Sequence, residues 1–116
     1  MSAARPEGAE VARVALDALV DGQATRLEGG EAGICVVRLG DRVYAIGDRC
    51  SHANVSLAEG EVDPDERTVE CWKHGSAFSL LDGEPQSLPA VSPVPVYDAE
   101  VVDGQVVVHA RVEEQR

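Results

Sequence analysis

Aromatic residues are scarce in this sequence, and it has no long hydrophobic run. Phe, Trp and Tyr make up 3% of the 116 residues, so a core must be built mainly from Val, Leu, Ala and Ile. No apolar stretch approaches the roughly 20 residues that a membrane-spanning helix needs. Residues 1–10 also lack the apolar centre of a secretory signal. We therefore expect a cytoplasmic protein without a membrane partner, and its length fits one domain over residues 1–116.

Positive charge is equally scarce. The sequence has 10 Lys and Arg residues against 21 Asp and Glu residues, giving a formal net charge of −11, and Lys73 is its only lysine. Nucleic acids and anionic membranes would be repelled, so neither is expected as a partner. A protein with a basic surface fits better, although solubility alone would also explain the charge. The acidic residues from Glu59 to Glu70 either dock such a partner or form a solvated loop.

Cysteine is limited to Cys35, Cys50 and Cys71. An odd number in a chain without an export signal argues against a disulfide framework and favours metal binding or redox chemistry. Cys35 lies within the apolar run Ile34 to Val37, so we expect it in the core and not as a ligand.

Short apolar or alternating runs, separated by turn residues, recur along the chain. This pattern is typical of an all-β sandwich or small barrel. Residues 87–95 contain Pro89, Pro93 and Pro95 and predict a stiff, irregular loop, because proline cannot donate a hydrogen bond to a sheet. The expected strands cover residues 11–16, 24–28, 33–39, 42–48, 67–71, 77–81, 94–102 and 105–110.

Two short segments each contain one cysteine and one histidine. They are Cys50-Ser-His52 and Cys71-Trp-Lys-His74, and each follows an expected strand. An antiparallel connection would bring both segments to the same end of a sheet. Two thiolates and two imidazoles would then converge, and this donor set suits zinc or an iron–sulfur centre.

The spacing C-x-H followed by C-x-x-H resembles the ligand motif of Rieske [2Fe–2S] proteins, in which two histidines replace two cysteines on one iron. Structural zinc modules usually pair cysteine with cysteine and histidine with histidine. The resemblance covers about residues 11–110. The gap between His52 and Cys71 is slightly long for the family, and we expect the extra turn in the acidic stretch 62–66. The resemblance is carried by segments 50–57, 59–60, 71–78, 82–83 and 88–90.

The resemblance implies a Rieske fold, a small antiparallel sandwich or barrel with a cluster-binding lobe at about residues 48–90. It implies that Cys50 and Cys71 bind an inner iron and that His52 and His74 bind an exposed outer iron of one [2Fe–2S] cluster. It further implies a soluble one-electron carrier, not an enzyme, of the ferredoxin type in aromatic-ring dioxygenase systems. Its partners would be a flavin-dependent ferredoxin reductase and a terminal non-haem iron oxygenase.

The chain departs from the respiratory Rieske proteins in two ways. Those proteins carry an extra, disulfide-bonded cysteine in each ligand loop, where this chain has Val55 and Lys73. They also hold the cluster sulfurs with a serine and a tyrosine hydroxyl; Ser76 matches the serine, but Phe78 replaces the tyrosine. Because hydrogen bonds to sulfur raise the potential, we expect a value toward the low end of the Rieske range of about −150 to +300 mV.

The residues beside the second ligand pair have functional and structural interpretations. Trp72 either contacts a partner or caps the end of a sheet. Lys73 either offsets charge at the centre or is simply solvated. Gly75 fits a close approach of the backbone to the cluster, or a turn. Ser76 is expected to hydrogen-bond the cluster, whereas His109, which has no cysteine nearby, is expected at the surface or a sheet edge.

Three other interpretations remain open. The chain also resembles Rieske proteins that accompany iron–sulfur cluster assembly, and the small subunits of assimilatory nitrite reductases. A zinc-stapled interaction module without redox function is the third. In all cases the chain is too short to add the roughly 200-residue catalytic domain of an oxygenase large subunit.

Overall fold

Strands and tight turns account for nearly all of the regular structure in this computed structural model, which describes residues 8–30, 32–51, 54–88, 90 and 92–111. Within these residues the strands are β1 (Glu10–Ala15), β2 (Ala24–Leu27), β3 (Ile34–Leu39), β4 (Arg42–Gly47), β5 (Glu61–Asp63), β6 (Thr68–Glu70), β7 (Ala77–Ser79), β8 (Val96–Val102) and β9 (Gln105–Ala110). Two 3₁₀ turns, η1 (Leu16–Ala18) and η2 (Leu57–Glu59), join them. The expected all-β class is confirmed. None of the helical turns in the described residues is long or apolar enough to cross a membrane.

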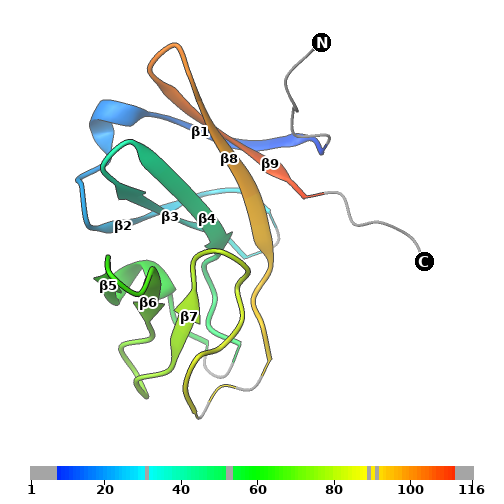
Figure 1. The fold of residues 1–116 in the computed structure, drawn as a ribbon. Coiled ribbons are helices and arrows are strands. Elements are labelled where there is room, and N and C mark those ends of the chain that lie inside the picture. Colours follow the sequence, from blue (N-terminus) through cyan, green and yellow to red (C-terminus); the bar gives the residue numbers. More distant parts are fainter. Residues whose placement is uncertain (1–7, 31, 52–53, 89, 91, 112–116) are drawn as a thin grey trace.

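The strands form two antiparallel sheets. The larger has the order β1-β9-β8-β4-β3-β2, and the smaller has the order β5-β6-β7. Figure 1 shows the larger sheet above the smaller one, with the segments that follow β4 and β6 reaching the lower end of the molecule. These two segments carry Cys50 and Cys71.

The larger sheet curls around an apolar cluster of its own. Each of its six strands contributes a side chain to this cluster, which a flat sheet could not achieve. The buried members are mainly aliphatic, as the low aromatic content requires. They are Leu19, Ile34, Val36, Ala45, Val106 and Val108.

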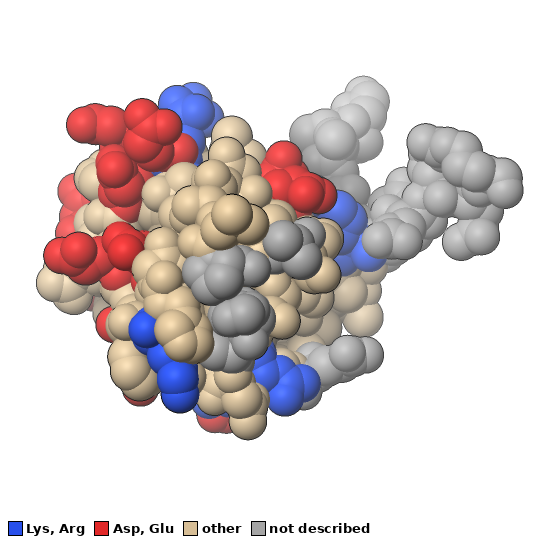
Figure 2. Space-filling view, turned by 90° about the horizontal axis from the view of Figure 1, so that it is seen from below, with Lys and Arg blue, Asp and Glu red and all other residues tan. Residues whose placement is uncertain are grey.

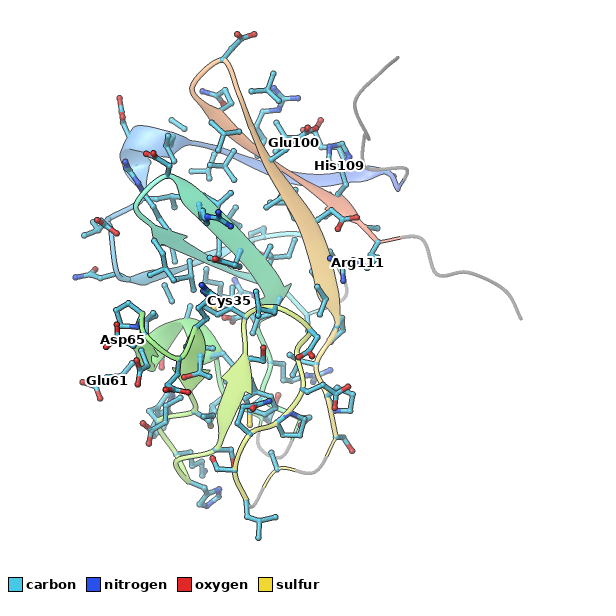
Figure 3. All side chains as sticks on the ribbon, viewed as in Figure 1. Cys35, Glu61, Asp65, Glu100, His109 and Arg111 are labelled. Carbon is cyan, nitrogen blue, oxygen red and sulfur yellow. The ribbon has the colours of Figure 1, made fainter. Side chains whose placement is uncertain are left out.

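Strand β3 is buried on both faces. Because side chains alternate along a strand, Ile34 and Val36 face the first cluster, whereas Cys35 and Val37 face a second cluster between the two sheets. All four are fully buried, which explains an apolar run without polar alternation. Figure 3 places Cys35 between the sheets, and its expected role as a core residue is confirmed.

Strand β5 corrects one expectation. We expected an extra turn in residues 62–66, and a turn lies at residues 64–67, but Glu61–Asp63 before it pairs with β6 as a strand that we did not predict. Pairing Val62 with Val69 packs the partly buried Val62 against the second cluster, which local acidity could not reveal. The Asp63 carboxylate then accepts hydrogen bonds from the backbone N–H groups of Asp65 and Glu66, at 3.0 and 3.1 Å.

Two adjacent leucines test the second cluster. Leu80 is 2% exposed and belongs to the cluster, whereas Leu81 is 52% exposed. We expect Leu80→Ala to lower the free energy of unfolding by about 2–5 kcal/mol, through lost burial and a residual cavity. Leu81→Ala should change it by no more than about 0.5 kcal/mol. Anaerobic urea titrations of both variants measure this, and equal losses would contradict the assignment of Leu80 to the core.

Cys35 gives the fold a defined pH dependence. Burial, helped by the Asp48 carboxylate, raises the pKa of the Cys35 thiol far above its ordinary value. Above about pH 8.5 the unfolded chain loses this proton and the folded chain keeps it, so stability should fall by up to roughly 1.4 kcal/mol per pH unit. Cys35→Ala should therefore lose less stability than the parent protein between about pH 8 and pH 10. Parallel stability profiles would contradict this expectation.

Candidate metal centre

The first ligand segment is a closed loop that begins directly after β4. The Cys50 N–H donates to the Val55 carbonyl at 3.1 Å, and the Leu57 N–H donates to the Asp48 carbonyl at 2.6 Å. Cys50 is 4% exposed. His52, the second ligand predicted here, lies outside the described residues.

The second ligand segment has the same closure. The Cys71 N–H donates to the Ser76 carbonyl at 2.7 Å, so in both segments a cysteine N–H reaches the carbonyl five residues later. The Gly75 N–H donates back to the Cys71 carbonyl at 2.9 Å. Gly75 has a φ of 80°, which favours glycine at this turn. The turn interpretation of Gly75 is therefore confirmed, and a close approach to a cluster stays a prediction.

The two thiols are buried, whereas His74, the one predicted ligand histidine among the described residues, is exposed. Cys50 and Cys71 belong to the same buried cluster, together with Leu57, Phe78 and Ala90. None of the three cysteines, all of which are described, forms a disulfide. His74 is exposed, as are its neighbours Trp72 and Lys73.

The irregular loop predicted over residues 87–95, called the third loop from here on, contacts both ligand segments through its described residues. The Ser87 hydroxyl accepts a hydrogen bond from the Ala77 N–H at 2.9 Å, and the Ser76 hydroxyl accepts one from the Ala90 N–H at 3.0 Å. On the other side, the Ser51 hydroxyl donates to the Ser92 carbonyl. Pro89 lies outside the described residues. The described parts of this loop therefore hold the two ligand segments at a fixed spacing.

The predicted neighbours of the centre differ in burial. Trp72 is 54% exposed, and both of its interpretations, a contact with a partner and a cap on the end of a sheet, stay predictions. Ser76 is buried and accepts the hydrogen bond from Ala90, which leaves its hydroxyl hydrogen for another acceptor. Phe78 is fully buried in the second cluster. Hydrogen bonding of Ser76 to a cluster stays a prediction that this geometry permits.

Sequence reasoning missed Asp48, the residue at the base of the first ligand segment. Its carboxylate is 2% exposed, and it accepts hydrogen bonds from Arg26 Nε at 3.1 Å and from the Ala58 N–H at 2.9 Å. The only local signal was an aspartate at the end of an apolar strand. The arginine that pairs with it is 22 residues earlier in the chain.

The donor set fits a [2Fe–2S] cluster of the Rieske type. Such a cluster takes two thiolates on one iron and two imidazoles on the other, which matches two buried cysteines beside an exposed histidine. No three His, Cys, Asp or Glu side chains among the described residues meet as a ligand group for one metal ion.

Charge is distributed unevenly around this end of the molecule. Figure 2, seen from below, shows most Asp and Glu on one side, Lys and Arg along another, and uncharged residues among the described ones in the middle. The acidic side includes the smaller sheet, where Glu61, Asp63, Glu66 and Glu70 line a shallow hollow. Figure 3 shows Glu61 and Asp65 pointing away from the protein on this side.

Comparison with known proteins identifies the family. The model of the Rieske [2Fe–2S] domain matches residues 10–98. Over 79 residues the chain is 43% identical to ferredoxin CarAc of Metapseudomonas resinovorans, covering 68% of this chain and 72% of the relative.

Solved structures agree with the family match. The ferredoxin of carbazole 1,9a-dioxygenase from Nocardioides aromaticivorans IC177 superposes with a TM-score of 0.83 at 35% identity, covering 89% of this chain and 99% of the other. A chain in the complex of reduced oxygenase and oxidized ferredoxin of carbazole 1,9a-dioxygenase gives 0.79 at 34% identity, covering 91% and 95%. A Mycobacterium tuberculosis protein provisionally named an NADH-dependent nitrite reductase small subunit gives 0.70 at 33% identity, covering 87% and 93%. The chain thus belongs to the Rieske [2Fe–2S] domain family, and it is an electron carrier with one Rieske-type cluster, not an enzyme in its own right.

Proposed function

We propose that Cys50, His52, Cys71 and His74 hold the cluster and that the chain passes single electrons, in the cytoplasm, from a flavin-dependent ferredoxin reductase to a terminal non-haem iron oxygenase. The observation that carries this proposal is the burial of both thiols in one core beside an exposed histidine. The complex of oxygenase and ferredoxin among the similar structures supports an oxygenase as the electron acceptor.

Each ligand has a distinct task in this proposal. A bound Rieske cluster supplies a one-electron redox couple in which neutral imidazoles make the added electron less costly than four thiolates would. Cys50 and Cys71 hold the inner iron away from water, because both side chains are buried. His74 would extend the outer end of the centre to the surface, where an electron can enter or leave without a substrate pocket.

The residues around the ligands set the potential in the low part of the Rieske range. Ser76 offers a hydroxyl hydrogen to the centre, while Phe78, buried at the position of the second hydroxyl in respiratory relatives, offers none. Fewer hydrogen bonds to sulfur leave the reduced state less stable. The net charge of −11 acts in the same direction.

The exposed surface beside the centre supports docking of a protein partner. Trp72, 54% exposed, and Lys73 lie between two ligands, so a partner that approaches His74 meets them. The acidic side of the smaller sheet suits a partner with basic residues, here assigned to the reductase.

A role in nitrite reduction is the second candidate. It is favoured by the Mycobacterium tuberculosis structure, which is 33% identical to this chain. The ferredoxin relatives share higher identity, so we place oxygenase supply first. A role in cluster assembly would use the same ligand set. Electron transfer from the reduced protein to purified oxygenase or to purified nitrite reductase separates these roles.

The direct test of the proposal is an EPR spectrum before and after dithionite, with iron and zinc measured on the same anaerobic sample. We expect a silent oxidised state, a rhombic reduced signal with mean g well below the free-electron value, and two irons per chain. A silent reduced state with one zinc per chain would contradict the proposal and would favour the zinc-stapled interaction module.

Replacing a ligand histidine by cysteine tests the ligand set. We expect His52→Cys and His74→Cys to lower the reduction potential or to lose the cluster, because an anionic thiolate replaces a neutral imidazole. Voltammetry and the EPR signal measure both effects.

The matched control is the same substitution at the third histidine. His109 lies on β9, where Figure 3 shows it beside Glu100 at the opposite end of the molecule from the ligand segments. His109→Cys should keep the potential and spectrum of the parent protein. An unchanged potential in His74→Cys would remove His74 from the ligand set.

A further inference from the structure

Buried polar side chains of the described residues are confined to the ligand segments. Apart from the cysteines, two polar residues among the described ones are buried, Asp48 and Ser76. Ser76 anchors the second segment to the third loop. Asp48 lies at the start of the first segment, and it is the only buried acidic or basic side chain among the described residues.

Asp48 joins both ends of the first segment. Its carbonyl accepts the hydrogen bond from the Leu57 N–H at 2.6 Å, and its Oδ1 accepts one from the Ala58 N–H at 2.9 Å. Residues 48–58 are therefore closed into a loop through one residue, and this loop contains Cys50. Loss of the carboxylate would leave the Ala58 N–H without this acceptor.

The same residue attaches the loop to the larger sheet. The Asp48 N–H donates to the Gly33 carbonyl at 3.1 Å, next to β3. The Asp48 Oδ2 accepts a hydrogen bond from Arg26 Nε, on β2, at 3.1 Å. Gly33 has a φ of 88°, and a Cβ there would lie 2.7 Å from the Arg26 guanidinium. A side chain at position 33 would thus displace the arginine from Asp48.

Burying a carboxylate is costly unless it is paired and hydrogen-bonded. Asp48 meets this condition through Arg26, which is 41% exposed and also pairs with Glu28 on its outer side. The Asp48 carboxylate is therefore a buried charge at the base of the loop that carries Cys50, and it is balanced only in part because Arg26 is shared with the exposed Glu28. A fixed negative charge near a redox centre disfavours an added electron.

We infer that Asp48 is a positioning residue for the first ligand segment and that its charge, partly balanced by Arg26, lowers the reduction potential of the cluster. This inference rests on the proposed function, because it takes Cys50 as a ligand.

The test compares three variants with one control. Asp48→Ala removes both acceptors and the charge, whereas Asp48→Asn keeps an acceptor for the Ala58 N–H, removes the charge and places an amide NH₂ donor where Oδ2 accepted from Arg26 Nε. Arg26→Gln removes the balancing charge from a side chain that is 41% exposed. The control, Asp63→Asn, makes the same charge change at an exposed carboxylate that also accepts backbone hydrogen bonds, in the turn after β5.

We expect Asp48→Ala to change the EPR g values of the reduced centre and to speed cluster loss, and Asp48→Asn to restore the parent spectrum. The potential should rise in Asp48→Asn and fall in Arg26→Gln. The shift expected in Asp48→Asn is up to about tenfold in the ratio of reduced to oxidised protein, or about 59 mV for one electron. A purely structural role would not shift the reduction potential in opposite directions when Asp48 and Arg26, the two members of one ion pair, are changed. Asp63→Asn should change neither spectrum nor potential by a comparable amount.

Iron content and EPR of the parent protein are measured first. If the parent protein lacks the Rieske signal, the proposed function and this inference both fail. If the parent signal is present but the potentials of Asp48→Asn and Arg26→Gln match that of Asp63→Asn, the inference alone fails. If Asp48→Ala does not fold, the other two variants still decide, since Asp48→Asn keeps an acceptor and Arg26 is partly exposed.

Discussion

The burial of β3 on both faces is the constraint on which the rest of the structure depends. Its alternating side chains contribute to the core of the curled sheet and to the core between the sheets, so the two layers share one strand. Strand β4 pairs with β3 along its length, and β6 and β7 pack onto the other side of the second core. The segments after β4 and β6 therefore emerge beside the same apolar cluster. Two cysteines 21 positions apart become neighbours in that cluster because of sheet packing, not because of any local turn.

Burial of the thiols and exposure of the imidazole then follow from one arrangement. Each cysteine is the first residue of a loop closed by its own N–H, so it stays at the core edge of the loop, and in the second loop His74 is exposed. The third loop completes the site by giving Ser76 a buried partner and Ser51 an acceptor. Among the described residues, the two buried polar side chains other than cysteine, Asp48 and Ser76, both fix these loops, so their desolvation cost falls in the part of the protein that needs a defined geometry.

The sequence predicted the parts of this structure that local chemistry determines. The apolar run of β3 and the turns that end β3 and β8 are read from neighbouring residues, and the Cys-His pairs are recognisable because both members lie within one loop. Strand β5 escaped prediction because its acidic composition is typical of a turn, and only pairing with β6 and the packing of Val62 reveal it. Asp48 escaped for a related reason. Its burial depends on Arg26 from another strand, and nothing in the spacing of the two residues along the sequence indicates that they pair.

The acidic residues of the smaller sheet and the exposed apolar residues at the ligand end lie on different parts of the surface. The acidic side of the smaller sheet lies beside the ligand end and not across it, while uncharged residues occupy the middle of that end (Figure 2). Exposed charges raise the rate of encounter and orient an oppositely charged partner, but they are screened by salt and add little affinity. Trp72 and Leu88 are both exposed, and in the proposed function they would supply the apolar contact of a short-lived complex. An electron carrier must dissociate from one partner before it binds the next. Charges that speed association without adding much affinity suit this task, because the complex can still dissociate quickly.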